Sequence, residues 1–281
     1  MPEYKLDQEL LADYARHLRT VERSPGTVAK YLRDAGNFAQ WLGSRAVSRE
    51  AATGWKGYLL TQGYASSTIN SMLAALNSLF RFLGWEDCRV KFLKVQRRLF
   101  RDPARELTRD EYDRLLAAAR TQGQERLALL MEAICATGIR VSEVRYLTVE
   151  AAKNGRADIA LKGKIRTILI PNKLCRKLLK YARQQKTASG EIFLTRNGTS
   201  LGRRQIWYEL KRLCTTAGVE PSKVFPHNLR HLFALTFYRA YKDIVRLADV
   251  LGHSSIDTTR IYLAASGAEY NRQLERLGLM T

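Results

Sequence analysis

The sequence predicts a mainly α-helical protein of two domains: a four-helix N-terminal domain and a mixed α+β domain that contains a small β-hairpin. Three observations lead to this prediction. The 281 residues suffice for two domains with a core each. Apolar residues recur at helical spacing from Leu6 to about Leu83. Two β-rich runs later meet at Lys162-Gly163-Lys164, which is typical of a hairpin.

The N-terminal domain is expected to span residues 1–90. Short polar joints separate its helices, and Ser24-Pro25 combines a capping residue with proline in the first turn. Gly54 and Gly57 weaken the helix in which they lie. The expected helices run from Leu6 to Leu18, from Pro25 to Gly43, from Ser48 to Gly63 and from Ser66 to Gly84.

A basic linker is expected over residues 91–105, where Lys and Arg cluster around Pro103 and the helical periodicity stops. Two interpretations of the linker stand side by side: a strap along a phosphate backbone, or a solvated connector. The second domain would then cover residues 106–281. Its first helix begins at Thr108, because Glu111 three residues later completes a capping box.

Further elements of the second domain follow from apolar spacing and from Gly or Pro at their ends. Gly252 ends one helix, and Ser254 with Asp257 is expected to form a capping box for the next. The expected segments are helices 127–137, 142–147, 173–185 and 200–217, a hairpin over 157–171, a helix that begins at Pro226, and a tail helix over 266–281.

The charge balance points to a polyanionic partner. Lys and Arg number 47 against 27 Asp and Glu, which gives a net charge of +20 on a chain of ordinary apolar content. Nucleic acid is the commonest partner of such a chain, and an anionic membrane is the alternative. No apolar run approaches the ~18 residues of a membrane span, and the first residues do not resemble a signal peptide. We therefore expect a soluble, cytoplasmic protein.

The cysteines predict neither a disulfide framework nor a metal site. Cys88, Cys135, Cys175 and Cys214 stand singly, with no C-x-x-C motif and no histidine at the spacing of a metal ligand. They are expected to be buried small apolar residues or inert thiols.

The candidate chemistry lies in residues 225–263, which contain three of the four histidines of the chain. His227, Arg230 and His231 are at i, i+3 and i+4, and thus share one face of a helix. His253 stands at the joint after Gly252, and Tyr262 follows nine residues later. Alone, H-x-x-R is a weak motif, and Tyr262 would be a half-buried core residue.

Four motifs in one order together resemble the tyrosine recombinases, the Xer and phage-integrase family. They are ATGIR-VSE at residues 136–143, the K-G turn at Lys162, H-x-L-R-H at residues 227–231, and L-G-H-S-S-x-x-T-T-x-x-Y at residues 251–262. The resemblance covers essentially the whole chain. It implies an N-terminal core-binding domain of the SAM-like type and a tyrosine recombinase catalytic domain.

The resemblance also implies a role for each matching residue. Tyr262 would attack a scissile DNA phosphate and form a 3′-phosphotyrosyl intermediate. Arg140 and Arg230 would hold the non-bridging oxygens, with His227 and His253 beside them. Lys162 would be the general acid for the departing 5′-oxygen. The hairpin resembles the family's K-G-x-K-x-R but lacks one turn residue, so Lys164 is the alternative. Glu143 and His231 would be supporting residues.

The residue types fit this chemistry without a metal or another cofactor. Planar guanidiniums and imidazoles can neutralise the charge of a pentacoordinate phosphorus with preorganised donors. Tyrosine, with a pKa of about 10, is a weak nucleophile but its phenolate is a good leaving group. The covalent bond therefore conserves the energy of the cut phosphodiester and permits rejoining.

The expected partners are double-stranded DNA and further copies of the chain, which would assemble as a tetramer on two duplexes with exchange of the C-terminal helix, residues 266–281. A second recombinase or an accessory protein is a possible further partner. A noncatalytic DNA-binding protein of the same fold and an IB-type topoisomerase are the alternative functions. The surface residues expected to contact DNA are Lys30, Arg33, Arg203, Arg204 and Lys211.

Overall fold

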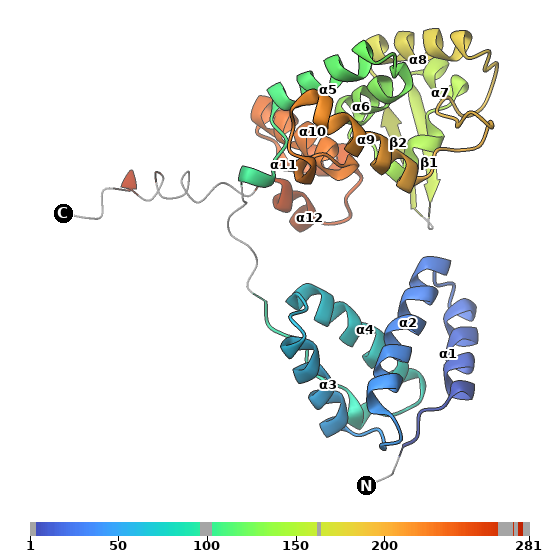
Figure 1. The fold of residues 1–281 in the computed structure, drawn as a ribbon, viewed down its shortest axis with the longest axis vertical. Helices are drawn as coiled ribbons and strands as arrows, with labels where there is room; N and C mark the ends of the chain where they lie inside the picture. Colours follow the sequence, from blue (N-terminus) through green and yellow to red (C-terminus); the bar gives the residue numbers. More distant parts are fainter. Residues whose placement is uncertain (1–3, 96–102, 162–163, 264–271, 273–274, 278–281) are drawn as a thin grey trace. The chain divides into compact units, whose positions relative to one another are not determined.

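The computed structural model describes residues 4–95, 103–161, 164–263, 272 and 275–277. The chain divides into two compact units, Met1–Arg97 and Arg98–Thr281. Each unit has its own hydrophobic core. Figure 1 shows the first unit as helices alone and the second as helices with one β-hairpin at its side, which confirms the predicted fold class.

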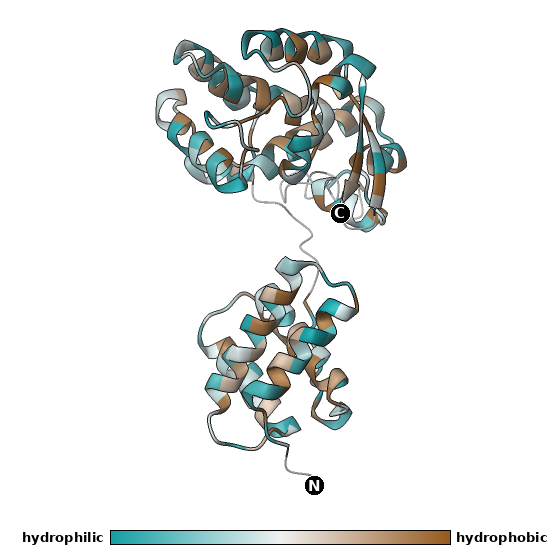
Figure 2. Ribbon diagram, turned by 90° about the vertical axis from the view of Figure 1, so that its right-hand side faces the viewer, coloured by the Kyte–Doolittle hydropathy of each residue, from teal (hydrophilic) through white to brown (hydrophobic). Residues whose placement is uncertain are grey.

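The N-terminal unit contains the predicted helices α1 (Gln8–Thr20), α2 (Pro25–Leu42), α3 (Arg49–Thr61) and α4 (Ser66–Phe82). Asp7, Ser24 and Ser48 cap the first three through their side chains. The apolar faces of the helices turn inward and the polar faces outward (Figure 2). Helix α3 continues through Gly54, where the Trp41 ring lies close enough for an added Cβ to touch it at 3.4 Å. The helix thus uses its glycine for close packing.

Residues 90–93 are tied to α4 by two asparagine side chains. Asn77 donates to the carbonyl of Val90 and accepts from its amide, at 2.9 and 3.0 Å. Asn70 pairs with Leu93 in the same way, at 2.9 and 2.8 Å. The first residues of the predicted linker therefore pack on the N-terminal unit, and residues 96–102 lie outside the described part of the chain.

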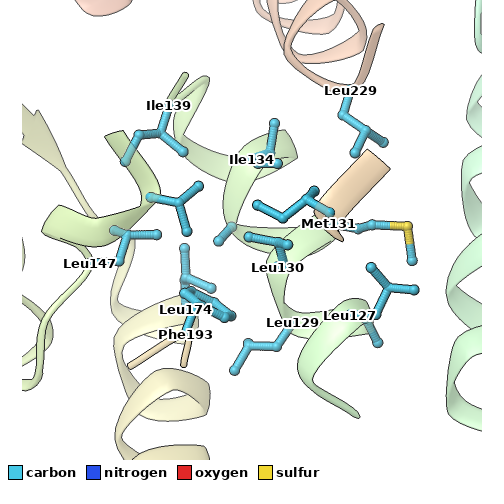
Figure 3. Close-up of a cluster of buried hydrophobic side chains, with 14 of the residues drawn as sticks. Leu127, Leu129, Leu130, Met131, Ile134, Ile139, Leu147, Leu174, Phe193 and Leu229 are labelled. Atoms are coloured by element: carbon cyan, nitrogen blue, oxygen red, sulfur yellow. The ribbon is translucent and has the colours of Figure 1, made fainter. Parts of the chain in front are cut away.

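The C-terminal unit is built around a buried helix. It begins with α5 (Arg109–Thr121), which has the predicted Thr108–Glu111 capping box. Helix α6 (Glu125–Thr137) follows and is buried on nearly all sides, as expected for a helix without a polar face. Figure 3 shows Leu130, Met131 and Ile134 of α6 among side chains from other elements, including Phe193 and Leu229. The site described below is attached to this core helix.

After α6 the predicted short helix is present as a 3₁₀ helix (Val141–Tyr146), and α7 (Val149–Asn154) follows. The predicted hairpin is present as β1 (Arg156–Leu161) and β2 (Lys164–Leu169), antiparallel, with Leu161 opposite Lys164. Helix α8 (Asn172–Gln184) agrees with its prediction. Side chains alternate along β2, so that Ile168 enters the core whereas Ile165 and Leu169 are exposed.

Helix α9 (Arg203–Ala217) begins later than predicted, because Ser200 pairs with Leu194 in an isolated β-bridge. The last elements are α10 (Pro226–Tyr241), α11 (Ile244–Leu251), α12 (Ile256–Arg260) and a 3₁₀ turn (Ile261–Leu263). Ser255, not the predicted Ser254, caps α12 by accepting from the amide of Asp257 at 3.2 Å. Most of the predicted tail helix, residues 266–281, lies outside the described residues.

The cysteines are free thiols, with Cys88, Cys175 and Cys214 buried and Cys135 half-buried. Burial raises the pKa of the Cys88 thiol to about 11, and a thiol with such a pKa is a poor nucleophile at neutral pH. Across the described helices, none is both long enough and apolar enough to cross a membrane.

Gly138, which ends α6, should be less replaceable than Gly155, which ends α7. Its φ is +62°, and an added Cβ would lie 2.6 Å from the Phe233 ring and 3.0 Å from Leu251. Gly155 ends α7 with φ +69° and nothing within 4 Å of the same position. Gly155→Ala should lower the unfolding free energy by about 1–2 kcal/mol through backbone strain. Gly138→Ala should cost about 1–3 kcal/mol more through overpacking.

Urea denaturation of the two variants and the wild type measures this difference. Equal losses of stability in the two variants would contradict the close packing described at Gly138.

Candidate active site

The predicted catalytic side chains come from separate elements that meet at the C-terminus of α11. Gly138 turns the chain out of α6 and places Arg140 at the start of the 3₁₀ helix. Helix α10 supplies His227, Arg230 and His231, and the joint after α11 supplies His253. Tyr262 lies in the 3₁₀ turn after α12. The structure thus brings together residues up to 122 positions apart.

Glu143 fixes Arg140 from two directions. Its Oε1 accepts from the Arg140 guanidinium at 3.0 Å, and its Oε2 accepts from the Arg140 backbone amide at 2.9 Å. The carboxylate is buried, yet its pKa is lowered, because these hydrogen bonds and the Arg166 guanidinium outweigh desolvation, the largest single effect. The Arg140 side chain is 38% exposed. It therefore remains accessible to a ligand while Glu143 fixes its position.

Arg230 is almost fully buried, with 2% of its surface exposed. It donates to the carbonyl of Gly138 and, at 2.8 Å, to the carbonyl of Leu251. Burial and the nearby Arg140 lower the pKa of its guanidinium to about 10, and the Tyr262 phenol opposes this shift. Arg230 therefore remains a cation at neutral pH, although it carries a large desolvation cost.

The C-terminal carbonyls of α11 receive three guanidiniums. Leu251 accepts from Arg230 and also from Arg166, the latter at 2.5 Å. Gly252 accepts from Arg140 at 3.3 Å. The C-terminus of a helix carries a partial negative charge and unpaired carbonyl groups, and cations there are favourable. This helix end therefore gathers the three arginines.

Arg166 was not among the predicted site residues. It lies on β2 and makes a 2.5 Å ion pair with Glu143, with only 14% of its side chain exposed. Its desolvation lowers the pKa of its guanidinium, and Glu143 opposes that shift. The signal was present in the sequence, because Arg166 is the final residue of the K-G-x-K-x-R pattern.

Gly252 allows the close approach of Arg166 to α11. Its φ is +63°, and an added Cβ would lie 2.4 Å from Cδ of Arg166. A side chain at this position would displace the guanidinium from Glu143 and from the Leu251 carbonyl. Gly252 is thus required for its conformation and for the space around it.

The neighbours of His253 define its tautomer. Its Nε2 lies 3.0 Å from Nη2 of Arg230, and its Nδ1 lies 2.9 Å from the hydroxyl of the fully buried Thr259. Arginine can only donate, so Nε2 accepts and the ring proton sits on Nδ1. Burial, followed by Arg230 and Arg140, lowers the pKa of His253 to about 4. The ring is thus neutral and orients Arg230.

Tyr262 lies among three imidazoles and is 4% exposed. The His253 ring stacks on it with centroids 5.7 Å apart and an interplanar angle of 11°. His227 and His231 lie 5.4 and 5.5 Å away by the same measure. His231 is also buried, and its Nε2 lies 3.6 Å from Oε1 of Glu106, just before α5. The phenol is therefore placed beside the arginines by contacts on several sides.

The structure does not decide between Lys162 and Lys164. Lys162 lies outside the described residues, as does the side chain of Lys164 at the start of β2. The roles predicted for both lysines stay predictions. Within the described ranges, no group of three or more His, Cys, Asp or Glu residues gathers as it would around a metal ion.

Two of the predicted DNA contacts, Lys30 and Arg33, share a buried carboxylate on α2. Asp34 is 2% exposed and lies 2.6 Å from Nζ of Lys30 and 3.0 Å from the Arg33 guanidinium. Lys30 also donates to the carbonyl of Ser71 on α4 at 3.2 Å. Lys30 is therefore fixed by α2 and α4, whereas 67% of the Arg33 side chain is exposed.

On α9, Arg203 and Arg204 are exposed at the first turn. Lys211 donates to the carbonyl of Pro221, and its ammonium lies 5.2 Å from the centre of the Trp207 ring. The α9 cations thus lie on the outer face of the unit, and their predicted contact with DNA remains a prediction.

Taken together, the arrangement provides guanidinium donors, an oriented neutral imidazole and a phenol within one site. Fixed donors of this kind stabilise charge that develops on a reacting group without further reorganisation. The phenol is the candidate nucleophile, because Tyr262 lies beside His253 and Arg230. The geometry suits the transfer of a phosphoryl group to an oxygen of the protein.

Comparison with known families agrees with this assignment of the two units. The phage integrase family model matches residues 105–269, and the model of the phage integrase N-terminal SAM-like domain matches residues 11–87. The tyrosine recombinase XerA of Thermococcus kodakarensis is 30% identical over 282 residues, which cover 97% of this chain and 96% of that protein.

Solved structures show the same fold. The Tn1549 transposon integrase in complex with transposon right end DNA is similar with a TM-score of 0.71 and 20% identity, covering 96% of this chain and 98% of the other. A lambda integrase tetramer bound to a Holliday junction is similar with a TM-score of 0.73 and 18% identity, covering 90% of this chain and 76% of the other.

The protonation of His253 can be tested directly. At neutral pH, a long-range proton–nitrogen spectrum of ring-labelled protein should show the neutral Nδ1–H tautomer. The unfolded ring takes up a proton near pH 6.5, whereas the folded ring does so only near pH 4. The folded state thus loses His253-linked stability as the pH falls from about 6.5 to about 4.

The control is His253→Gln, which cannot titrate. Its unfolding free energy should fall less steeply with decreasing pH across that window than the wild-type value. Equal slopes for the two proteins would show that the folded His253 ring does not have a lowered pKa.

Proposed function

Because this chain belongs to the phage integrase family of tyrosine recombinases, we propose that it is a site-specific DNA recombinase with Tyr262 as its nucleophile. The observation that carries this assignment is the convergence of Tyr262, His253 and Arg230 beside Arg140. Its XerA relative and its fold are compatible with both an Xer-like enzyme and a mobile-element integrase. Since its substrate is DNA, we expect it to act in the cytoplasm.

In the proposed cleavage step, Oη of Tyr262 bonds to the scissile phosphorus and the phenolic proton passes to solvent water. The bond from phosphorus to the 5′-oxygen breaks, and that oxygen leaves with a proton from Lys162 or Lys164. Rejoining reverses the step: a 5′-hydroxyl attacks the 3′-phosphotyrosyl bond and releases the phenol. Atoms balance without a cofactor, because a phosphodiester is exchanged for a phosphotyrosyl ester.

The arginines would act on the phosphate charge in both steps. Arg140 is the more exposed guanidinium, and Arg230 lies behind it with its position fixed by Gly138, Leu251 and His253. Donors held before the reaction need no reorganisation as charge builds on the equatorial oxygens. His227, in the first turn of α10, is the remaining proposed catalytic residue. Glu143 and His231 would support the catalytic residues without contacting the phosphate.

Binding to the duplex would use the basic surfaces of both units. Lys30 and Arg33 on α2, with Arg203, Arg204 and Lys211 on α9, are the proposed phosphate contacts. The related lambda integrase assembles as a tetramer on a Holliday junction, and we propose the same number of copies for this chain on two duplexes. The C-terminal segment, residues 266–281, would link neighbouring copies.

A covalent adduct tests the proposed function. We expect the wild type to form SDS-resistant adducts with a pool of randomised duplexes that each carry a nick, since loss of the short strand traps the intermediate. Sequencing of the trapped DNA then selects the preferred site. Tyr262→Phe should form none. It should bind DNA with the wild-type salt dependence, because phosphate contacts and not the phenol carry the affinity. Absence of an adduct in the wild type would favour a noncatalytic DNA-binding protein.

Removal of residues 266–281 tests the assembly. The shortened protein should bind and cleave the selected site but lose synapsis and strand exchange between two duplexes, measured by gel mobility and by recombinant product. Normal recombination by the shortened protein would contradict the linking role. Relaxation of supercoiled DNA by wild type without recombination would favour an IB-type topoisomerase.

A further inference from the structure

We propose that Arg166 is a positioning residue for the phosphate site: it holds Arg140 and the C-terminus of α11 in place and does not itself reach the phosphate. The inference rests on the proposed function and adds a residue to its machinery. Arg166 is the one guanidinium in the described part of the site that links the β-hairpin to both the 3₁₀ helix and α11.

The first arm of Arg166 acts through Glu143. Its Nη2 lies 2.5 Å from Oε2 of Glu143, while Oε1 of the same carboxylate binds Arg140 at 3.0 Å. One guanidinium per oxygen fixes the plane of the carboxylate. Without Arg166, Glu143 could rotate and Arg140 would lose its defined direction, although the Arg140–Glu143 ion pair could persist.

The second arm acts through the end of α11. Nη1 of Arg166 donates to the carbonyl of Leu251 at 2.5 Å, and Arg230 donates to the same oxygen at 2.8 Å. The next residue, Gly252, accepts from Arg140, and His253 then contacts Arg230. Arg166 thus fastens the segment that sets the positions of both phosphate-binding arginines.

Ion pairing and exposure separate Arg166 from the proposed phosphate ligands. Arg230 is buried as well, but it donates to carbonyl groups and pairs with no carboxylate in the described part of the chain. Arg166 is paired with Glu143, and its side chain is 14% exposed, against 38% for Arg140. Its terminal nitrogens are both engaged, one with a carboxylate and one with a carbonyl. A phosphate approaching Arg140 from solvent would therefore meet Arg166 only behind Glu143 and α11.

Arg166→Lys is the appropriate variant, because lysine keeps the charge but its single ammonium cannot bridge the two acceptors as a planar fork does. Arg156→Lys is the matched control. Arg156 lies on β1 of the same hairpin, with 63% of its side chain exposed and its nearest carboxylate, that of Asp158, 3.7 Å away. Unfolding midpoints of both variants report whether the fold is retained.

The cleavage rate is measured on the DNA site selected above, prepared with three scissile groups: a phosphodiester, a neutral methylphosphonate and a 5′-bridging phosphorothiolate. On the phosphodiester, Arg166→Lys should be about 100-fold slower than wild type, the loss expected for a misplacement of about 1 Å. The deficit should shrink markedly on the methylphosphonate, which has lost the charge that the arginines neutralise. It should be unchanged on the phosphorothiolate, whose sulfur leaves without a proton. Arg156→Lys should match wild type throughout.

Three outcomes would overturn the proposal. The first is a wild-type cleavage rate for Arg166→Lys on the phosphodiester. The second is an equal rate deficit on all three substrates, which indicates a merely structural role, and the third is recovery of the rate on the phosphorothiolate alone, which indicates an effect on the proton donor. Failure of the wild type to cleave any substrate would instead refute the proposed function. If Arg166→Lys does not fold, Glu143→Gln gives the same test, and it should show the same recovery on the methylphosphonate.

Discussion

The site depends on one electrostatic constraint: several buried or half-buried guanidiniums must lie close together before any phosphate arrives. The carboxylate of Glu143 and the free carbonyls at the end of α11 meet this constraint, because together they accept from Arg140, Arg166 and Arg230. Like charges at such spacing would otherwise repel. The C-terminus of α11 thus provides a fixed partial negative charge around which the arginines of the site are arranged.

The rest of the second unit keeps the C-terminus of α11 and the arginines in fixed relative positions. Helix α6 is buried on nearly all sides and gives a rigid base, and Gly138 turns the chain at its end so closely that Phe233 and Leu251 leave no room for a side chain. Thr259 of α12 then orients His253, and Tyr262 lies in the 3₁₀ turn that directly follows α12. Packing and polar contacts therefore specify the same geometry.

Much of this could be predicted from the sequence, for identifiable reasons. Helices with caps such as Ser24 and Thr108 and a hairpin between β-branched runs are local features, and they appear where local chemistry places them. Long-range contacts were less visible. The burial of Arg166 depends on Gly252, which lies 86 residues away in the chain, and a lysine- and arginine-rich hairpin normally suggests solvent exposure. The start of α9 moved for a similar reason, since Ser200 is recruited by a bridge to Leu194.

The paired asparagines of α4 have a consequence for protein engineering. The side chains of Asn77 and Asn70 form hydrogen bonds with the backbone amide and carbonyl of Val90 and Leu93, respectively, much as a neighbouring strand would. Val90 and Leu93 are therefore an integral part of the N-terminal unit. A chimaeric protein that exchanges N-terminal units between relatives should therefore join its parents after Leu93. A junction at residue 88 or 89 would separate α4 from Val90 and Leu93. Asn77 and Asn70 would then lose the native backbone groups with which they form hydrogen bonds.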